Sequence, residues 1–319
     1  MLIDLGILIG GLVVLIIGGE FLVKGAVGIA FKAHLSTLVI GMTVVSFGTS
    51  APELLVSIKA AFEGSPDIAI GNVIGSNIAN ISLVLGITVM IYALTVQRDT
   101  KIYDWPKMLL STLLFYAFAY DGIIVWFEGV IMVSLLIIYI AFIITKSRKQ
   151  TKKEKAELSE EELEAPESTG KSLLFLLIGL VGLYFGATWL LDGAVSLASK
   201  AGLSQRVIGI TIIAFGTSVP ELITCVVAAY RKETAISIGN LIGSNIFNIM
   251  AVIGITSIIH PIEVSQESLD FDFNWMVGFA LLLLPVIFWG KKVGFWKGAL
   301  VLGMYILYIL LLLLDSTAS

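Results

Sequence analysis

Ten long apolar stretches are the feature that most constrains the fold of this chain. A helix of about 20 apolar residues is long enough to cross the hydrocarbon core of a bilayer. Hydrophobic residues fill 57% of the 319 positions and charged residues only 14%, unlike the balance of a soluble domain. The sequence therefore predicts an all-α membrane protein with ten transmembrane helices. The expected spans are residues 3–31, 36–62, 68–95, 105–121, 123–145, 171–199, 204–230, 235–260, 273–290 and 294–314.

A charged segment divides these stretches into two sets of five. It begins as Lys146-Ser-Arg-Lys-Gln-Thr-Lys-Lys-Glu-Lys155 and continues as an acidic run from Glu157 to Glu167. A segment this polar cannot bury enough apolar surface to fold alone. We therefore expect a first five-span repeat in residues 1–145, a charged linker in 146–170 and a second five-span repeat in 171–319.

The positions of the basic residues predict the orientation of the chain. If the linker is cytoplasmic, 16 of the 20 Lys and Arg residues lie on that side, while Lys200 and Arg206 lie in opposite-side loops. Lys24 and Lys59 fall within spans, and we expect Lys24 to pair with Glu20, four residues before it. Membrane proteins carry such an excess of positive charge on the cytoplasmic side. The sequence thus predicts a multi-pass protein of the cell membrane with both termini outside.

The second half of the chain repeats the first at an offset of 168 residues. Gly41-Met-Thr-Val-Val-Ser-Phe-Gly-Thr-Ser-Ala-Pro-Glu-Leu54 returns as Gly209-Ile-Thr-Ile-Ile-Ala-Phe-Gly-Thr-Ser-Val-Pro-Glu-Leu222. A second motif, residues 71–81, returns as residues 239–249 with nine of eleven positions identical. Because each half has an odd number of spans, the second must enter the membrane from the opposite side. The sequence therefore predicts two inverted repeats, as in many secondary transporters.

The first duplicated motif places a carboxylate beside a proline inside an apolar span. Its polar side chains recur at i, i+3, i+4 and i+7 and so share one face of a helix. They are Ser46, Thr49, Ser50 and Glu53 in the first copy, and Thr217, Ser218 and Glu221, with Ala214 in the first position, in the second copy. Pro52 and Pro220 cannot continue the helical hydrogen bonds, which should release backbone oxygens near Thr49 and Thr217. An acidic side chain at membrane depth is costly and indicates a functional site.

The second duplicated motif combines small residues with hydroxyl and amide side chains. Its glycines, four residues apart, allow close helix packing. Ser76 and Asn80 lie four residues apart on a polar stripe, and Ser244 and Asn248 are their equivalents. Interrupted segments in corresponding positions of two halves indicate the binding site of a transporter. We expect broken helices in spans two, three, seven and eight.

The side chains of both motifs offer hard oxygen atoms. Such ligands suit sodium, calcium or magnesium better than zinc or copper, and magnesium fits less well because it dehydrates reluctantly. Glu53 and Glu221 together carry a charge of -2, which one Ca²⁺ neutralises and three monovalent cations exceed by one. The first balance favours calcium as an ion of this site, and the second predicts electrogenic exchange.

The paired Gly-Thr-Ser-x-Pro-Glu and Gly-Ser-Asn-Ile-x-Asn motifs resemble the two alpha-repeats of the sodium/calcium exchangers, within the calcium/cation antiporter superfamily. The likeness extends over nearly the whole chain. It implies an antiporter that exchanges Na⁺ for Ca²⁺ by alternating access, near three Na⁺ to one Ca²⁺. It also implies a five-plus-five inverted repeat in which the first and sixth spans slide past a gated core. Ca²⁺ and Na⁺ would be transported ions rather than cofactors.

The same resemblance implies roles for individual residues. Glu53 and Glu221 would be the central Ca²⁺ ligands, with backbone oxygens from Thr49 and Thr217. The remaining site residues would line sodium sites or the middle of the site: Ser46, Ser50 and Ser244 with Glu53; Ala214, Ser218 and Ser76 with Glu221; and Asn80 and Asn248 between them. Some relatives carry Asp at one of these Asn positions, which argues against potassium coupling here. The 25-residue linker leaves no room for the calcium-sensing domain of long-linker relatives.

Other functions stay open as alternatives. Two membrane carboxylates could carry protons in an H⁺/Ca²⁺ exchanger, although protons need no shell of Ser and Asn side chains. A passive cation channel would also use acidic pore residues, without needing an inverted repeat. We do not expect an enzyme, since no His-Glu-x-x-His and no nucleophile–base pair is found. The single cysteine, Cys225, excludes a cysteine metal cluster, no cofactor is expected, and nothing in the composition supports nucleic-acid binding.

Overall fold

The computed structural model describes residues 2–156, 168–200, 214–290 and 292–318. Helices dominate these ranges, and their four strands have two residues each. The chain forms two compact units: residues 1–52 with 135–243, and residues 53–134 with 244–319. Two of the three boundaries between the units, those after residues 52 and 243, fall inside the duplicated motifs. The acidic part of the linker and the beginning of the second copy of the first motif lie outside the described residues.

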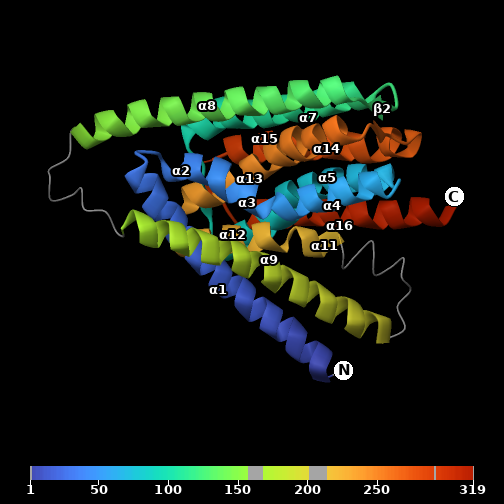
Figure 1. The fold of residues 1–319 in the computed structure, drawn as a ribbon, viewed down its shortest axis with the longest axis horizontal. Helices are drawn as coiled ribbons and strands as arrows, with labels where there is room; N and C mark the ends of the chain where they lie inside the picture. Colours follow the sequence, from blue (N-terminus) through green and yellow to red (C-terminus); the bar gives the residue numbers. More distant parts are fainter. Residues whose placement is uncertain (1, 157–167, 201–213, 291, 319) are drawn as a thin grey trace. The chain divides into compact units, whose positions relative to one another are not determined.

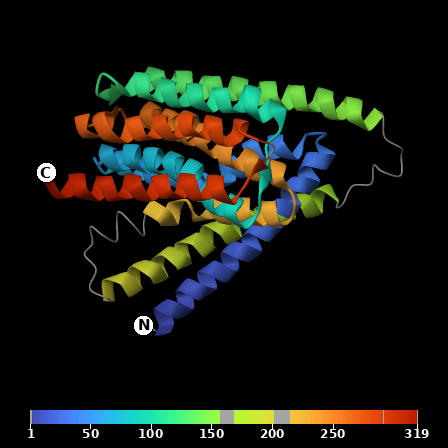
Figure 2. The same cartoon turned by 180° about the vertical axis from the view of Figure 1, so that it is seen from behind.

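Two long helices, α1 (Leu2–Lys32) and α9 (Thr169–Lys200), run side by side in the first unit. The pair is blue and yellow-green in Figure 1, and Figure 2 shows the same pairing from behind. The helices are antiparallel and meet along a line of glycines. A Cβ atom on Gly18 would lie 2.8 Å from the backbone nitrogen of Leu183 and 3.1 Å from the carbonyl oxygen of Gly179. The absence of a side chain at Gly18 therefore allows the two backbones to touch.

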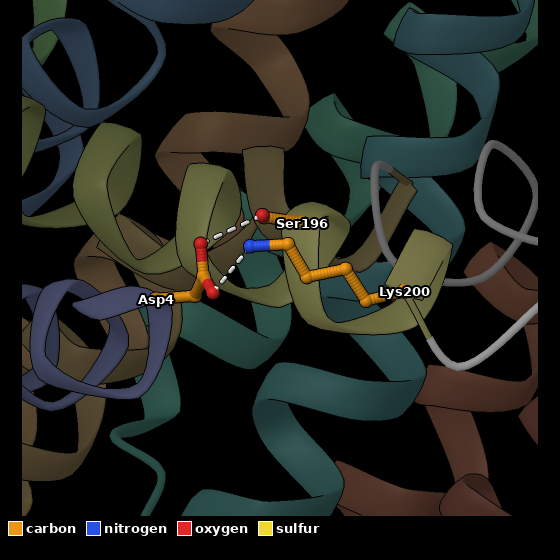
Figure 3. Close-up of polar contacts among 3 residues, drawn as sticks. All are labelled: Asp4, Ser196 and Lys200. Carbon is orange, nitrogen blue, oxygen red and sulfur yellow. Dashed lines mark hydrogen bonds and ion pairs between the residues drawn. The ribbon is translucent and has the colours of Figure 1, made fainter. Parts of the chain in front are cut away.

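An ion pair joins the first turn of α1 to the last turn of α9 (Figure 3). The Lys200 ammonium group donates a 2.6 Å hydrogen bond to one carboxylate oxygen of Asp4, and the Ser196 hydroxyl donates a 2.8 Å bond to the other. An acid in the first turn and a base in the last turn also complement the helix dipoles. The pair α1/α9 is thus held by backbone packing along its length and by charge at one end.

Glu20, in the middle of α1, pairs with Arg231 rather than with Lys24 as the sequence led us to expect. The carboxylate of Glu20 meets the guanidinium group of Arg231, which directly follows helix α12 (Val219–Tyr230). The ammonium group of Lys24 lies 6.0 Å from the centroid of the Phe21 ring instead. Sequence spacing identifies neighbours on the same helix, but the planar guanidinium fork from a neighbouring element is the better carboxylate partner.

Two helices break at the prolines of the first motif, as predicted for spans two and seven. The first broken segment consists of α2 (Thr37–Ile40), the π-helical turn η1 (Gly41–Val45), α3 (Ser46–Thr49) and α4 (Ala51–Phe62). Its two arms differ in direction by 42°. At the break, Ser50 has φ -87° and ψ 1°. The second break separates α11 (Ala214–Thr217) from α12 at Ser218, with φ -90° and ψ 1°. The breaks are equivalent positions of the repeat.

The predicted breaks in spans three and eight are wrong. The helices run without interruption from Pro66 to Ile91 and from Thr234 to Ile259. They consist of α5 (Pro66–Ala79), η2 (Asn80–Val84) and α6 (Leu85–Ile91), and of α13 (Thr234–Phe247), η6 (Asn248–Ile253) and α14 (Gly254–Ile259). Neither helix has an interior proline, and each instead widens into a π-helical turn that starts at Asn80 or Asn248. Such turns often occur at functional sites.

Two short strand pairs connect the two repeats within the second unit. β1 (Leu94–Thr95) pairs with β4 (Lys292–Val293), and β2 (Ile123–Ile124) pairs with β3 (Ile262–Glu263), both antiparallel. In each pair one strand comes from the first half of the sequence and the other from the second. Because β1 and β3 are equivalent in the repeat, as are β2 and β4, the two pairs are related by exchange of the halves.

The remaining helices of the structure also come in equivalent positions of the two halves. They are η3 (Thr100–Asp104), α7 (Trp105–Ala119) and α8 (Trp126–Ala156) in the first half, and η7 (Ser268–Asp272), α15 (Phe273–Phe288) and α16 (Phe295–Ala318) in the second. Helix α7 packs against α15. A hydrogen bond of 2.9 Å from the indole nitrogen of Trp105 on α7 to the carbonyl oxygen of Ala280 on α15 joins the two helices.

Seven helices in the described part of the chain are long and apolar enough to cross a membrane, or eight if the bent segment 37–62 is one span. The chain is therefore an all-helical membrane protein. The two other predicted spans correspond to the continuous helix formed by η3 and α7, and to the segment that ends in α12. Large apolar side chains such as Ile17 and Leu177 are half exposed, as expected for surfaces in contact with lipid.

Candidate ion-binding site

Each broken helix places a glutamate in the first turn of a new helix. Glu53 lies in the first turn of α4, and Glu221 lies in the first turn of α12. The helix dipole makes this the favourable end for a negative charge. Both side chains are nevertheless buried, with 0% and 1% of their surface exposed. A buried carboxylate is costly unless a hydrogen-bond donor or a cation compensates it.

In the first unit, the hydroxyl groups of Thr49 and Ser50 lie near the carboxylate of Glu221. Among the described residues, however, neither carboxylate oxygen of Glu221 has a partner with hydrogen-bond geometry, and the same is true of the hydroxyls of Ser50 and Ser218. All three side chains are buried. Buried oxygens with unused lone pairs form the kind of environment that a hard cation completes.

Helix α13 of the second repeat holds helix α3 of the first repeat in place. The Ser46 hydroxyl donates to the carbonyl oxygen of Gly41 at 2.8 Å and lies 3.1 Å from the backbone oxygen of Asn240. The Thr49 hydroxyl donates to the side-chain oxygen of Asn240 at 3.2 Å. Two predicted site residues of one repeat are therefore positioned by a residue of the other.

In the second unit, the residues of the second motif line two packed helices. Helix α5, which carries Ser76, packs against η6, which begins at Asn248. Ser76, Asn80, Ser244 and Asn248 are at most 4% exposed. Among the described residues, the Ser76 hydroxyl and both side-chain amide atoms of Asn80 and Asn248 have no hydrogen-bond partner. These groups again offer oxygen ligands without using them within the protein.

The predicted site residues fall into both compact units. Ser46, Thr49, Ser50, Thr217, Ser218 and Glu221 belong to the first unit, and Glu53, Ser76, Asn80, Ser244 and Asn248 to the second. Ala214 begins α11, and its side chain lies outside what the structure describes. The meeting of Glu53 with Glu221 stays a prediction. Among the described residues, no three His, Cys, Asp or Glu side chains gather as a metal cluster, so any bound ion would need hydroxyl, amide or backbone ligands.

Sequence reasoning overlooked two asparagines in the second motif. The side-chain nitrogen of Asn72 donates to the hydroxyl of Ser57 at 3.0 Å and to the backbone oxygen of Glu53 at 3.1 Å. In the second copy, that of Asn240 donates to the sulfur of Cys225 at 3.5 Å. Asn72 and Asn240 are identical across the repeat, and this identity was the signal that could have found them.

The chain is similar to known membrane proteins over nearly its whole length. The family described as "Sodium/calcium exchanger protein" matches residues 3–145 and 171–314. The sodium/calcium exchanger MaX1 of Methanosarcina acetivorans is 31% identical over 342 aligned residues, which cover 96% of this chain and 97% of that protein. The membrane protein MJ0091 of Methanocaldococcus jannaschii is 36% identical, over 97% of this chain and 98% of its own.

Solved structures show the same likeness in three dimensions. The sodium-calcium exchanger NCX_Mj, soaked with zero Na⁺ and Ca²⁺, superimposes with a TM-score of 0.83 at 34% identity. The match covers 97% of this chain and 99% of that one. The same exchanger soaked with 2.5 mM Na⁺ and 0.1 mM Ca²⁺ gives a TM-score of 0.82.

Proposed function

The chain belongs to the sodium/calcium exchanger family, a family of transporters and not of enzymes, and we propose that it exchanges Na⁺ for Ca²⁺ across the membrane. One observation carries this proposal. Buried oxygens of Glu221, Ser50 and Ser218 lack hydrogen-bond partners among the described residues, and these are ligands that Na⁺ and Ca²⁺ prefer. The oxygens of Ser76, Asn80 and Asn248 in the other unit have the same character.

Glu53 and Glu221 act in this proposal as ligands that both ions share. The backbone oxygens of Thr49 and Thr217 complete the Ca²⁺ site, and the other predicted residues bind Na⁺ or lie at the centre. Because one Ca²⁺ neutralises two glutamates whereas three Na⁺ leave one excess positive charge, the exchange is electrogenic near three to one. Each net charge that crosses the membrane then responds to voltage by about 2.3 kcal/mol per 100 mV.

Alternating access follows from the proposed arrangement of ten spans in two inverted repeats. Apart from α2 and η1, whose equivalents lie outside the described residues, each described element recurs at an offset near 168, which supports this arrangement. The strand pairs β1/β4 and β2/β3, which are related by exchange of the halves, support it as well. In this arrangement the linker is cytoplasmic and the termini are outside. The site would then open alternately to either face as the repeats exchange conformations.

The test is Ca²⁺ uptake into liposomes that contain the purified protein. An outward Na⁺ gradient at fixed pH should drive ⁴⁵Ca uptake, and a pH gradient without Na⁺ should not. Glu53→Gln and Glu221→Gln should each reduce uptake to the level of empty liposomes, because each removes one of the two charges that balance Ca²⁺. The isosteric change keeps the side-chain volume, so that loss of charge is the variable.

Different outcomes point to different functions. Uptake that follows the pH gradient alone would replace Na⁺ by H⁺ as the coupling ion. Uptake that needs no counter-ion gradient would indicate a channel. Full Na⁺-driven uptake by Glu53→Gln or Glu221→Gln would contradict the assignment of that residue. Asn274→Ala is a suitable control, since Asn274 donates a 2.7 Å bond to the backbone oxygen of Asp270 and belongs to neither motif.

A further inference from the structure

Asn240 lies where three helices of the first unit meet. It is fully buried on α13, with 0% of its surface exposed. Its side-chain oxygen accepts from Thr49 on α3, and its side-chain nitrogen donates to Cys225 on α12. Its backbone oxygen accepts from Ser46, also on α3. Every polar group of the side chain is therefore engaged with a residue of another helix.

The contact with Cys225 links Asn240 to the helix of Glu221. Cys225 follows Glu221 by four residues on α12, so the two lie one turn apart on the same face. The thiol in turn donates to the backbone oxygen of Ser237 at 3.5 Å. A chain of contacts thus runs from Thr49 through Asn240 to Cys225, and from there along one helical turn to Glu221.

The first repeat contains the same link with a hydroxyl in place of the thiol. Ser57 follows Glu53 by four residues on α4, and its hydroxyl accepts the 3.0 Å hydrogen bond from Asn72. Asn72 and Asn240 are equivalent positions of the repeat, as are Ser57 and Cys225. The link is therefore a property of both halves and not an accident of one helix contact. In the second repeat, Asn240 additionally reaches across to Thr49 of the first.

We propose that Asn240 is a positioning residue, which sets the place of Thr49 relative to Glu221, and that Asn72 does the same for the turn of Glu53. In this proposal Asn240 acts through Thr49 and Cys225, the two residues that its side chain contacts. The inference rests on the proposed function, in which the Thr49 backbone and the Glu221 carboxylate bind one Ca²⁺. Ca²⁺ ligands lie within 2.3–2.6 Å of the ion, so a shift of about 1 Å between them weakens binding.

Two substitutions of Cys225 test whether its contact with Asn240 matters. Cys225→Ser installs the hydroxyl that the first repeat has at Ser57, and it should preserve the acceptor for Asn240. Cys225→Ala removes that acceptor at nearly the same volume. If the contact matters, the alanine variant should weaken Ca²⁺ binding and the serine variant should not, although both remove the thiol.

The experiment measures Na⁺-driven ⁴⁵Ca uptake in liposomes over a range of Ca²⁺ concentrations. Asn240→Ala should raise the half-saturating Ca²⁺ concentration about three- to tenfold, the effect of one or two lost hydrogen bonds, with a smaller change in maximal rate. Cys225→Ala should give part of this shift. Thr49→Val keeps the backbone oxygen but loses the hydroxyl, and adding it to Asn240→Ala should cause little further change, because both break the same contact.

Several results would overturn the proposal. An unchanged half-saturating concentration for Asn240→Ala would do so, as would equal shifts for Cys225→Ser and Cys225→Ala, or fully additive effects of Asn240→Ala and Thr49→Val. If Asn240→Ala does not fold, the Cys225 pair and Thr49→Val still decide the question. Asn274→Ala, which removes an exposed amide that donates to the backbone oxygen of Asp270, controls for the general effect of truncating a hydrogen-bonded asparagine.

A second readout separates this inference from the proposed function. Ca²⁺ that binds the folded protein raises its thermal unfolding midpoint in detergent, whatever ion is exchanged for it. If the wild-type protein shows no Na⁺-driven uptake, the proposed function fails, but the Ca²⁺ concentration that gives half of the thermal shift still tests Asn240. If the wild-type protein transports and Asn240→Ala matches it in both assays, only the inference fails.

Discussion

At the scale of single residues, the two repeats differ in chemistry at Ser46. Its equivalent in the second copy is Ala214, so one proposed sodium site has a hydroxyl that the other lacks. The Ser46 hydroxyl is buried and contacts the backbone oxygens of Gly41 and Asn240. The same residue therefore serves in the packing of α3 and, in the proposed function, in binding Na⁺.

Ser46→Ala should weaken the dependence of exchange on Na⁺ more than its dependence on Ca²⁺. A buried hydroxyl contact contributes about 0.5–1.5 kcal/mol of free energy. Losing that contribution to Na⁺ binding should raise the half-saturating Na⁺ concentration roughly two- to tenfold. Uptake measured at fixed Ca²⁺ against increasing internal Na⁺ tests this. Ser111→Ala is the matched control, since the buried Ser111 hydroxyl donates only to Met108 on its own helix and is no proposed ligand. Equal effects of both variants would remove Ser46 from the sodium site.

At the scale of elements, the contact between α1 and α9 depends on the absence of side chains. The atoms nearest to a Cβ on Gly18 all belong to the backbone of α9, at 2.8–3.1 Å. A backbone cannot move aside as the end of a flexible side chain can. Gly10 lies on the same helix, and a Cβ there would meet no described atom within 4 Å.

Gly18→Ala should therefore destabilise the protein, whereas Gly10→Ala should not. Overpacking of a tight contact costs about 1–3 kcal/mol, and the better helix propensity of alanine offsets at most about 1 kcal/mol of it. The thermal midpoint in detergent should fall for Gly18→Ala and stay the same or rise slightly for Gly10→Ala. Equal thermal midpoints for the two variants would mean that α1 and α9 can move apart at Gly18 without a loss of stability. The close glycine contact would then not be needed for stability.

Sequence patterns anticipated some of these elements and not others. The breaks at Ser50 and Ser218 were predictable because Pro52 and Pro220 act on their own turn of helix. The unbroken helices through Asn80 and Asn248 were not, because a π-helical turn depends on how the polar residues pack and leaves no proline to mark it. The partner of Glu20 was missed for a similar reason, since Arg231 is more than 200 positions away along the chain.

At the scale of the whole molecule, two ion pairs of α1 bear on how the protein moves. Asp4 joins α1 to α9, whereas Glu20 joins α1 to Arg231 at the end of α12, the helix that carries Glu221. If α1 and α9 slide together past the helices of the site, the first pair stays intact during transport and the second must separate. The pair of Asp4 therefore reports on movement of α1 relative to α9. The pair of Glu20 reports on movement of α1 and α9, as one body, relative to the end of α12.

Cross-linking these positions should have opposite effects. In a Cys225→Ser background, a short thiol cross-linker between Asp4→Cys and Lys200→Cys should leave Na⁺-driven uptake close to that of the reduced protein. The same reagent between Glu20→Cys and Arg231→Cys should lower uptake to background, and cleavage of the link should restore it. Single-cysteine variants treated with the reagent control for modification alone. Loss of uptake on linking positions 4 and 200 would show that α1 and α9 move separately.

The sequence alone determined that this chain is a helical membrane protein, that its halves are repeats, and that a duplicated Glu beside Pro indicates ion binding. Those conclusions depend on properties that act locally: the length of apolar segments, the missing hydrogen-bond donor of proline and the cost of a charge in the membrane. Only the tertiary structure decided that Asn240 holds Thr49, that Arg231 pairs with Glu20, and that glycines of α1 face the backbone of α9. These partners are far apart in sequence, and their choice follows from how whole helices pack, which local pattern does not encode.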